Sequence, residues 1–139
     1  MLFRSANGFR VITGGTDNHL VLCDVTPLGV TGKEATAALE SVGITVNKNS
    51  IPGETRSPMV TSGVRYGTPA ATTRGMGSAE MEQIAAWSAE TIARREDPGA
   101  LARIRDEVTK LARGFPVPGR DASDLASAGE RQPTIQRGV

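Results

Sequence analysis

The sequence predicts an α+β domain in which a small, mostly antiparallel sheet carries helices packed on one face. Short β-branched runs separated by turn-forming residues predict the strands, and three amphipathic segments with start and stop signals predict the helices. Strands and helices do not alternate regularly enough for a doubly wound sheet. The chain has 139 residues, of which 38% are hydrophobic, which is enough for one domain with its own core.

Four strands are expected. Arg10–Thr13 and His19–Asp24 are rich in β-branched and apolar residues, and the Gly-Gly-Thr-Asp between them favours a turn, so we expect an antiparallel pair. Ile44–Val46 is a short apolar run that predicts a third strand. A long polar loop with two prolines follows, and Ser62–Tyr66 predicts the fourth strand.

The first helix is expected over Gly32–Val42. Thr31 precedes it and Glu34 stands three residues later, which is the pattern of a capping box. Gly43 follows the last apolar residue, where a left-handed conformation commonly ends a helix.

Two more helices and a tail complete the chain. Apolar residues at helical spacing predict helices over Ser78–Arg95 and Pro98–Arg113, the second with proline in its first turn. Residues 119–139 have almost no periodic apolar content, so we expect a disordered tail after a domain that spans residues 1–118.

Composition narrows the class of protein. The net charge of +1 and the pI of about 7.9 give no basic footprint for nucleic acid, and no apolar run is long enough to cross a bilayer. Cys23 is the lone cysteine and lies in an apolar run, which is typical of buried packing. These features predict a protein of the cytoplasm, without nucleic-acid or membrane partners.

Arg65 is the most unusual residue of the sequence because it stands inside the apolar fourth strand, with Gly63 and Gly67 on either side, which would let a ligand or another backbone come close. A buried guanidinium needs a partner. Two interpretations stay open: an internal salt bridge to Asp17 or Asp24, or a ligand that carries a carboxylate or phosphate, which the planar fork of arginine fits.

Two other polar clusters are weaker candidates. Asn47, Lys48 and Asn49 follow the third strand, and their amides could bind the edge of a heterocycle, although an asparagine-rich turn is the commoner explanation. Asp17 and His19 could bind a metal, but without a third ligand a structural turn is the better interpretation.

Taken together and in this order, the segments "TGGTDNHLVLCDV" and "TGKEATAALESVGITVNKNSIPGETRSPMVTSGVRYGTPAATTRGM" resemble serine hydroxymethyltransferase. The resemblance extends over about residues 8–118 and implies the C-terminal small domain of a fold-type I pyridoxal-phosphate enzyme, with the fold of the aspartate aminotransferase group. That enzyme moves a one-carbon unit from serine to tetrahydrofolate and leaves glycine, and it is a homodimer.

The resemblance implies roles for two residues. Arg65 matches the arginine that binds the α-carboxylate of the amino-acid substrate, and Asn49 matches the asparagine beside the folate pterin. No catalytic residue and no metal site is implied. The family's Schiff-base lysine lies in a threonine-rich motif of the large domain, and this sequence has no such motif. Pyridoxal phosphate and tetrahydrofolate are therefore expected in the complete enzyme and not on this chain alone.

Three hypotheses follow from the resemblance. The chain is part of a serine hydroxymethyltransferase that needs a large pyridoxal-phosphate-binding domain or chain as its partner, and it is inactive by itself. Alternatively, it is a non-catalytic truncated copy or interaction module that pairs with a full-length enzyme. A piece of a related enzyme, such as a threonine aldolase or a transaldolase, is disfavoured by the "NKN" and "TDNH" segments.

Overall fold

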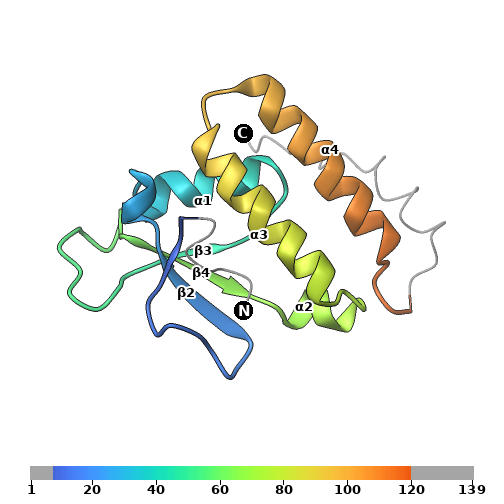
Figure 1. Ribbon diagram of the computed structural model, residues 1–139, viewed down its shortest axis with the longest axis horizontal. Helices are drawn as coiled ribbons and strands as arrows, with labels where there is room; N and C mark the ends of the chain where they lie inside the picture. The colour runs from blue at the N-terminus through green and yellow to red at the C-terminus, as the bar shows by residue number, and fades with distance from the viewer. Residues whose placement is uncertain (1–7, 120–139) are drawn as a thin grey trace, which may run out of the picture.

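The computed structural model describes residues 8–119 and confirms the α+β architecture (Figure 1). Its sheet has the strand order β1-β2-β4-β3, and every neighbouring pair is antiparallel. The strands are β1 (Arg10–Val11), β2 (Leu20–Asp24), β3 (Asn47–Asn49) and β4 (Gly63–Gly67). Because β4 pairs with both β2 and β3, it is an inner strand, and the asparagine cluster of β3 lies directly beside it.

The three predicted helices are present with slightly different ends. They are α1 (Gly32–Ser41), α3 (Ser78–Ala93) and α4 (Pro98–Gly114). Two short elements were not expected, a 3₁₀ turn at Thr26–Leu28 and the helix α2 (Pro69–Thr73). Both carry proline at their start, where its fixed φ suits a helical turn, but both are too short to show an apolar period.

The third strand was predicted in the wrong place. Ile44–Val46 was expected, whereas the ladder begins at Asn47, opposite Arg65. Ile44 and Val46 are buried, and the N–H of Ile44 donates to the carbonyl of Leu39 at 3.0 Å in the turn that ends α1. Their apolar alternation therefore reflects packing of a connecting segment against the core and not strand pairing.

The ends of α1 follow the predicted capping signals. The Glu34 N–H donates to Thr31 Oγ1 at 3.2 Å, and the Thr31 N–H donates to Glu34 Oε2 at 2.8 Å. Gly43 has φ of 85°, the left-handed conformation that was expected after the helix.

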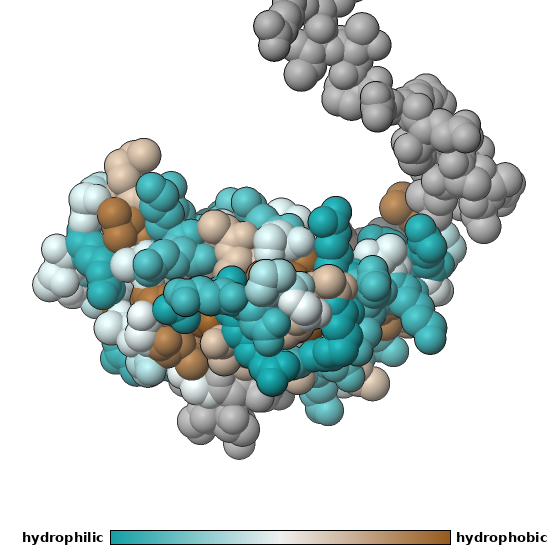
Figure 2. Space-filling model, turned by 90° about the horizontal axis from the view of Figure 1, so that it is seen from above, coloured by the Kyte–Doolittle hydropathy of each residue, from teal (hydrophilic) through white to brown (hydrophobic). Residues whose placement is uncertain are grey.

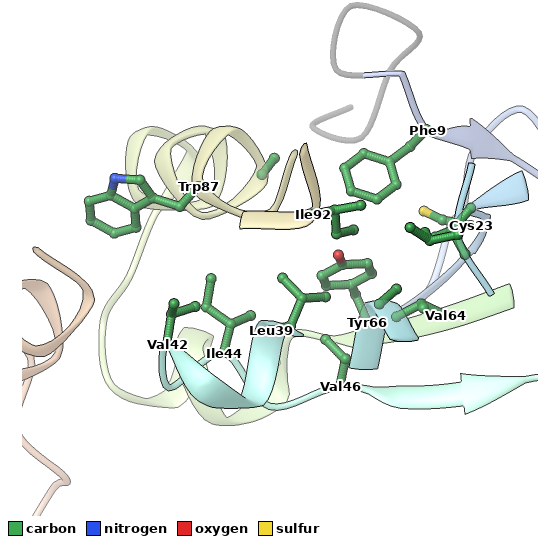
Figure 3. Packing of buried hydrophobic residues seen from close by; sticks show 14 of the residues in the cluster. Phe9, Cys23, Leu39, Val42, Ile44, Val46, Val64, Tyr66, Trp87 and Ile92 are labelled. Carbon is green, nitrogen blue, oxygen red and sulfur yellow. The ribbon is translucent and has the colours of Figure 1, made fainter. Parts of the chain in front are cut away.

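The core lies between one face of the sheet and the helices α1 and α3. Leu39 of α1, Ile92 of α3 and Tyr66 of β4 point toward one another in this layer (Figure 3). Phe9 packs edge-on against Tyr66, with ring centroids 6.1 Å apart. This packing makes the face of the sheet that carries Tyr66 the inner face.

Helix α4 forms an outer layer against α3 (Figure 1). Trp87 of α3 donates its Nε1–H to Glu107 of α4 at 2.7 Å. At the far end, the guanidinium of Arg74 donates to the carbonyls of Ala112 and Phe115, which places a cation at the C-terminus of α4. Viewed from above Figure 1, hydrophilic residues cover most of the surface, with small apolar patches between them (Figure 2).

The predicted tail lies outside the described residues except for Gly119, so the domain boundary near residue 118 stays a prediction. Across residues 8–119 no helix has the length and apolar content that a membrane span requires.

Candidate binding face around Arg65

Strand β4 separates its apolar side chains from Arg65. Val64 and Tyr66 are buried on the inner face, whereas Arg65 between them is exposed. Successive side chains of a strand point to opposite faces, so Arg65 leaves the sheet on the outer face, away from α1 and α3. A cation can therefore stand between two apolar residues of this strand, because alternate side chains face the core and the solvent.

The strand register brings the asparagine cluster to the same face. Leu22 on β2 and Asn47 on β3 are the direct partners of Arg65. Two residues further along β3, Asn49 pairs with Gly63. Direct partners across a strand pair share a face, and so do residues two apart. Arg65, Asn47 and Asn49 thus lie together on the outer face.

Gly63 is needed for this arrangement because the backbone of β3 runs close beside it. A Cβ at this position would lie 2.6 Å from the carbonyl oxygen of Asn49 and 2.7 Å from Cγ2 of Ile51. Any larger residue would push the strand that carries Asn47 and Asn49 away from β4.

The internal salt-bridge interpretation of Arg65 is wrong for Asp24. Asp24 is 4% exposed and pairs with Arg10, whose Nε and Nη2 lie 3.0 and 2.6 Å from Oδ2. Burial acts to raise the pKa of Asp24, but hydrogen bonds from Thr26 and Arg10 outweigh it and lower the pKa below its usual value. Asp24 is therefore already satisfied by other residues.

Asp17, the other acid considered, is exposed and makes no ion pair with any residue of the described chain. Within residues 8–119, Arg65 has neither a hydrogen bond nor an ion pair through its side chain. Its guanidinium fork is thus available to an external carboxylate or phosphate.

Asn49 is half-buried at the end of β3. Its Nδ2 donates to the carbonyl of Ser50 at 2.9 Å, which fixes the orientation of the amide. In this orientation the Oδ1 atom remains an acceptor for a donor of a ligand. Asn47, which sequence analysis did not single out from its cluster, is exposed beside Arg65. The position of Asn47 beside Arg65 follows from the strand register, which local sequence does not contain.

The remaining candidates do not form a reactive site. Burial raises the pKa of the Cys23 thiol to about 12, so it is a core residue and not a nucleophile. In the described part of the chain no group of three potential ligands could hold a metal ion, and Asp17 and His19 remain in a turn.

The outer face is open and is not a finished pocket. A mainly apolar hollow of about 260 Å³ lies near Tyr66, Trp87 and α2, and another of about 380 Å³ lies near His19 and Ser78. Neither includes Arg65 or Asn49 in its lining. Ligand pockets generally surround most of their ligand, so the described residues alone do not enclose a ligand beside Arg65 and Asn49.

Comparison with known proteins identifies the family. Residues 3–88 match the family model for serine hydroxymethyltransferase. The chain belongs to the serine hydroxymethyltransferase family. It is 55% identical over 114 residues to the serine hydroxymethyltransferase of Sorangium cellulosum, a match that covers 82% of this chain and 27% of that protein.

Other relatives show the same relationship. The serine hydroxymethyltransferase of Methanospirillum hungatei is 55% identical over 113 residues, covering 81% of this chain and 27% of the relative. The serine hydroxymethyltransferase of Koribacter versatilis is 53% identical over 121 residues, a match that covers 86% of this chain and 28% of that protein. The chain thus spans about a quarter of the length of the curated relatives it matches.

Membership in this family raises the question of whether the described residues fit pyridoxal phosphate, and they do not. A site for this cofactor requires a lysine for the Schiff base near the substrate. Lys48 is paired with Val64, so it lies on the opposite side of β3 from Asn47 and Asn49. Lys33 is in the first turn of α1 and Lys110 is on α4, the outer layer. None of the three lysines shares a face with Arg65.

Proposed function

We propose that this chain supplies the substrate-carboxylate and folate contacts of a serine hydroxymethyltransferase, which transfers a one-carbon unit from serine to tetrahydrofolate. In this role Arg65 binds the carboxylate of the amino acid through two parallel hydrogen bonds. Asn49 contributes its free amide oxygen to the polar edge of the folate pterin. The single observation that carries the proposal is the unpaired guanidinium of Arg65 on an open sheet face beside two asparagines, within the described part of the chain.

The arrangement favours a carboxylate over other ligands. A guanidinium presents its donors as a planar fork that matches the two oxygens of a carboxylate. The neighbouring Asn47 amide can add a further donor without adding charge. The outer face therefore provides one net positive charge and several donors, which suits an anion of single charge such as the carboxylate of serine or glycine.

The described residues give binding and orientation but not the chemistry of the transfer. When bound in a complete enzyme, pyridoxal phosphate supplies the electron sink that the reaction needs. Because no lysine of the described residues lies on the face of Arg65, we propose that a large domain or chain of the same enzyme holds this cofactor opposite the outer face. We further propose that the assembly is a homodimer in the cytoplasm, as the family resemblance implies.

A second candidate function is a non-catalytic module that pairs with a full-length enzyme. The absence of a cofactor-binding lysine near Arg65 among residues 8–119 is compatible with this role. The two candidates differ in their dependence on Arg65, since a module that only associates with an enzyme does not need a free guanidinium for a substrate.

Complementation distinguishes these candidates. The chain is co-expressed with the part of the Sorangium cellulosum relative that lies outside the matched region, and the purified mixture is assayed for conversion of serine to glycine with tetrahydrofolate. The proposal expects activity that neither piece has alone and that Arg65→Lys abolishes. Association without activity, or activity that Arg65→Lys leaves unchanged, contradicts the proposal and favours the non-catalytic module.

A further inference from the structure

The loop that joins β3 to β4, residues 50–62, is organised around the carboxylate of Glu54. One oxygen, Oε1, accepts hydrogen bonds from two backbone N–H groups and one hydroxyl, and the other, Oε2, accepts from two more backbone N–H groups. The donors are the N–H groups of Ile51, Thr55, Arg56 and Ser62 and the hydroxyl of Ser62. The bonds to Ser62 are the shortest, at 2.8 Å from its N–H and 2.7 Å from its Oγ.

Through Ser62, this carboxylate reaches the start of β4. Ser62 is buried and directly precedes Gly63, the partner of Asn49. Its carbonyl accepts from the N–H of Val25 at 3.0 Å, which ties it to the end of β2. Arg56 also donates to Ser62 Oγ at 2.6 Å, so the same hydroxyl that donates to Glu54 accepts from a guanidinium. Glu54 thus connects Ile51, two residues after β3, with Ser62, the residue directly before β4.

The far end of the loop is fixed against α1. The N–H groups of Gly32 and Lys33 donate to the carbonyls of Thr61 and Val60, both at 3.0 Å. Thr61 has φ of 59°, a left-handed conformation that is uncommon for a β-branched residue and is maintained only when its surroundings hold it. The N–H of Thr61 itself donates to the carbonyl of Ser57 at 3.0 Å, and on the side of β4 the N–H and hydroxyl of the next residue, Ser62, donate to Glu54.

We propose that Glu54 is a positioning residue of the binding face: it fixes the end of β3 against the start of β4, so that Asn49, Asn47 and Arg65 present their side chains together. The inference rests on the proposed function for the identity of the ligand but not for the geometry. Glu54 itself does not contact the ligand. Its bonds to Ser62 act on Asn49 through the Asn49–Gly63 pair and on Arg65 through β4, which begins at the next residue.

The first test uses the full 139-residue chain. Nuclear magnetic resonance records the side-chain amide signals of Asn47 and Asn49 and the Nε–H signal of Arg65 in Glu54→Ala and Glu54→Gln. The matched control is Glu80→Ala, because Glu80 also accepts a backbone N–H, that of Gly77 at 2.7 Å, but at the start of α3. We expect the three signals to move in both Glu54 variants, less in Glu54→Gln, which keeps one acceptor oxygen, and to stay in place in the control.

Unchanged signals in both Glu54 variants, or equal changes in Glu80→Ala, overturn the inference. If Glu54→Ala does not fold, Glu54→Gln alone decides between these results.

The second test measures glycine affinity in the complemented enzyme. Glu54→Ala is expected to weaken glycine binding about 10- to 100-fold, as misplaced binding groups do, and Glu54→Gln is expected to have an intermediate effect. Glycine affinity that is unchanged in Glu54→Ala would also overturn the inference. Failure of the unmodified complex to bind glycine contradicts the proposed function, whereas the signals still decide the role of Glu54.

Discussion

Asn47 and Arg65 are direct partners across the antiparallel β3–β4 pair, and their side chains leave the sheet on the face opposite the core. This relationship places an amide and a guanidinium side by side on rigid strands, without an acid in the described chain to neutralise the cation. Sites built on strands are more precise than sites on loops, which is the basis for the proposal that this pair receives an anion from outside.

Stability in acid is expected to depend on Glu54. The N–H of Arg56, together with Ser62 and Ile51, lowers the pKa of Glu54 to about 2 in the folded chain, from a usual value near 4.5. A carboxyl with a lowered folded pKa stabilises the fold above its unfolded pKa, and this stabilisation is lost as the pH falls through the folded value. The free energy of unfolding should therefore decrease from about pH 5 to pH 2, and Glu54→Gln should flatten this decrease. Chemical denaturation at several pH values measures the free energy of unfolding. An equal decrease from about pH 5 to pH 2 in the unmodified chain and in Glu54→Gln would contradict the prediction.

Gly32→Ala is expected to destabilise the fold although alanine favours helices. A Cβ at this position would lie 2.2 Å from Thr61 Oγ1 and 2.6 Å from the carbonyl oxygen of Gly63. Such overpacking typically costs about 1–3 kcal/mol. Gly114→Ala is the control, because a Cβ added there, at the end of α4, would meet no neighbouring atom within 4 Å, and it should be neutral or slightly stabilising. Thermal unfolding of both variants checks this, and a stable Gly32→Ala would show that the loop can move away from α1.

Thr91→Val is expected to leave the fold unchanged or make it more stable. Thr91 is fully buried in α3, and its hydroxyl has no hydrogen-bond partner among the described residues. Valine has the same shape without the desolvated hydroxyl, so a gain of up to about 1 kcal/mol is reasonable. The exposed Thr109→Val in α4 should change stability by less than about 0.5 kcal/mol. If Thr91→Val lost more than about 0.5 kcal/mol of folding stability, the prediction would be contradicted, because the Thr91 hydroxyl would then have a hydrogen-bond partner in solution.

The chain alone is expected to form no specific adduct with pyridoxal phosphate and not to interconvert serine and glycine. The reason is that Lys33, Lys48 and Lys110 lie on separate elements, none on the face of Arg65. Borohydride reduction followed by peptide mass spectrometry checks this. A saturable adduct on Lys48 would contradict the prediction, whereas weak labelling of all three lysines would not.

The fold was predictable from sequence where local signals determine it. The capping box of Thr31 and Glu34 and the left-handed Gly43 need only neighbouring residues, and both are confirmed. The third strand was displaced because Ile44 and Val46 are buried by tertiary packing, while the ladder depends on the distant β4. Local sequence does not contain that pairing.

The same limit applies to the candidate site. Arg65 could be found because a cation in an apolar strand is anomalous in sequence. Asn47 depends on register, and Glu54 depends on Ser62, eight residues further along, so both required the structure. An acidic residue in a loop rich in proline and glycine gives no local signal of the bonds it makes.

The central claim is that Arg65 serves a ligand and not the fold, and Arg65→Lys tests it most directly when stability and glycine affinity are measured on the same variant of the complemented enzyme. Lysine keeps the charge but loses the planar fork. The matched control is Arg10→Lys, because Arg10 lies on the same sheet but pairs with the buried Asp24. For Arg65→Lys we predict an unchanged melting temperature and a loss of about 2–5 kcal/mol in glycine binding. For Arg10→Lys we predict the reverse, a lower melting temperature with unchanged affinity. A clear drop in the melting temperature of Arg65→Lys, with glycine affinity unchanged, would contradict the account.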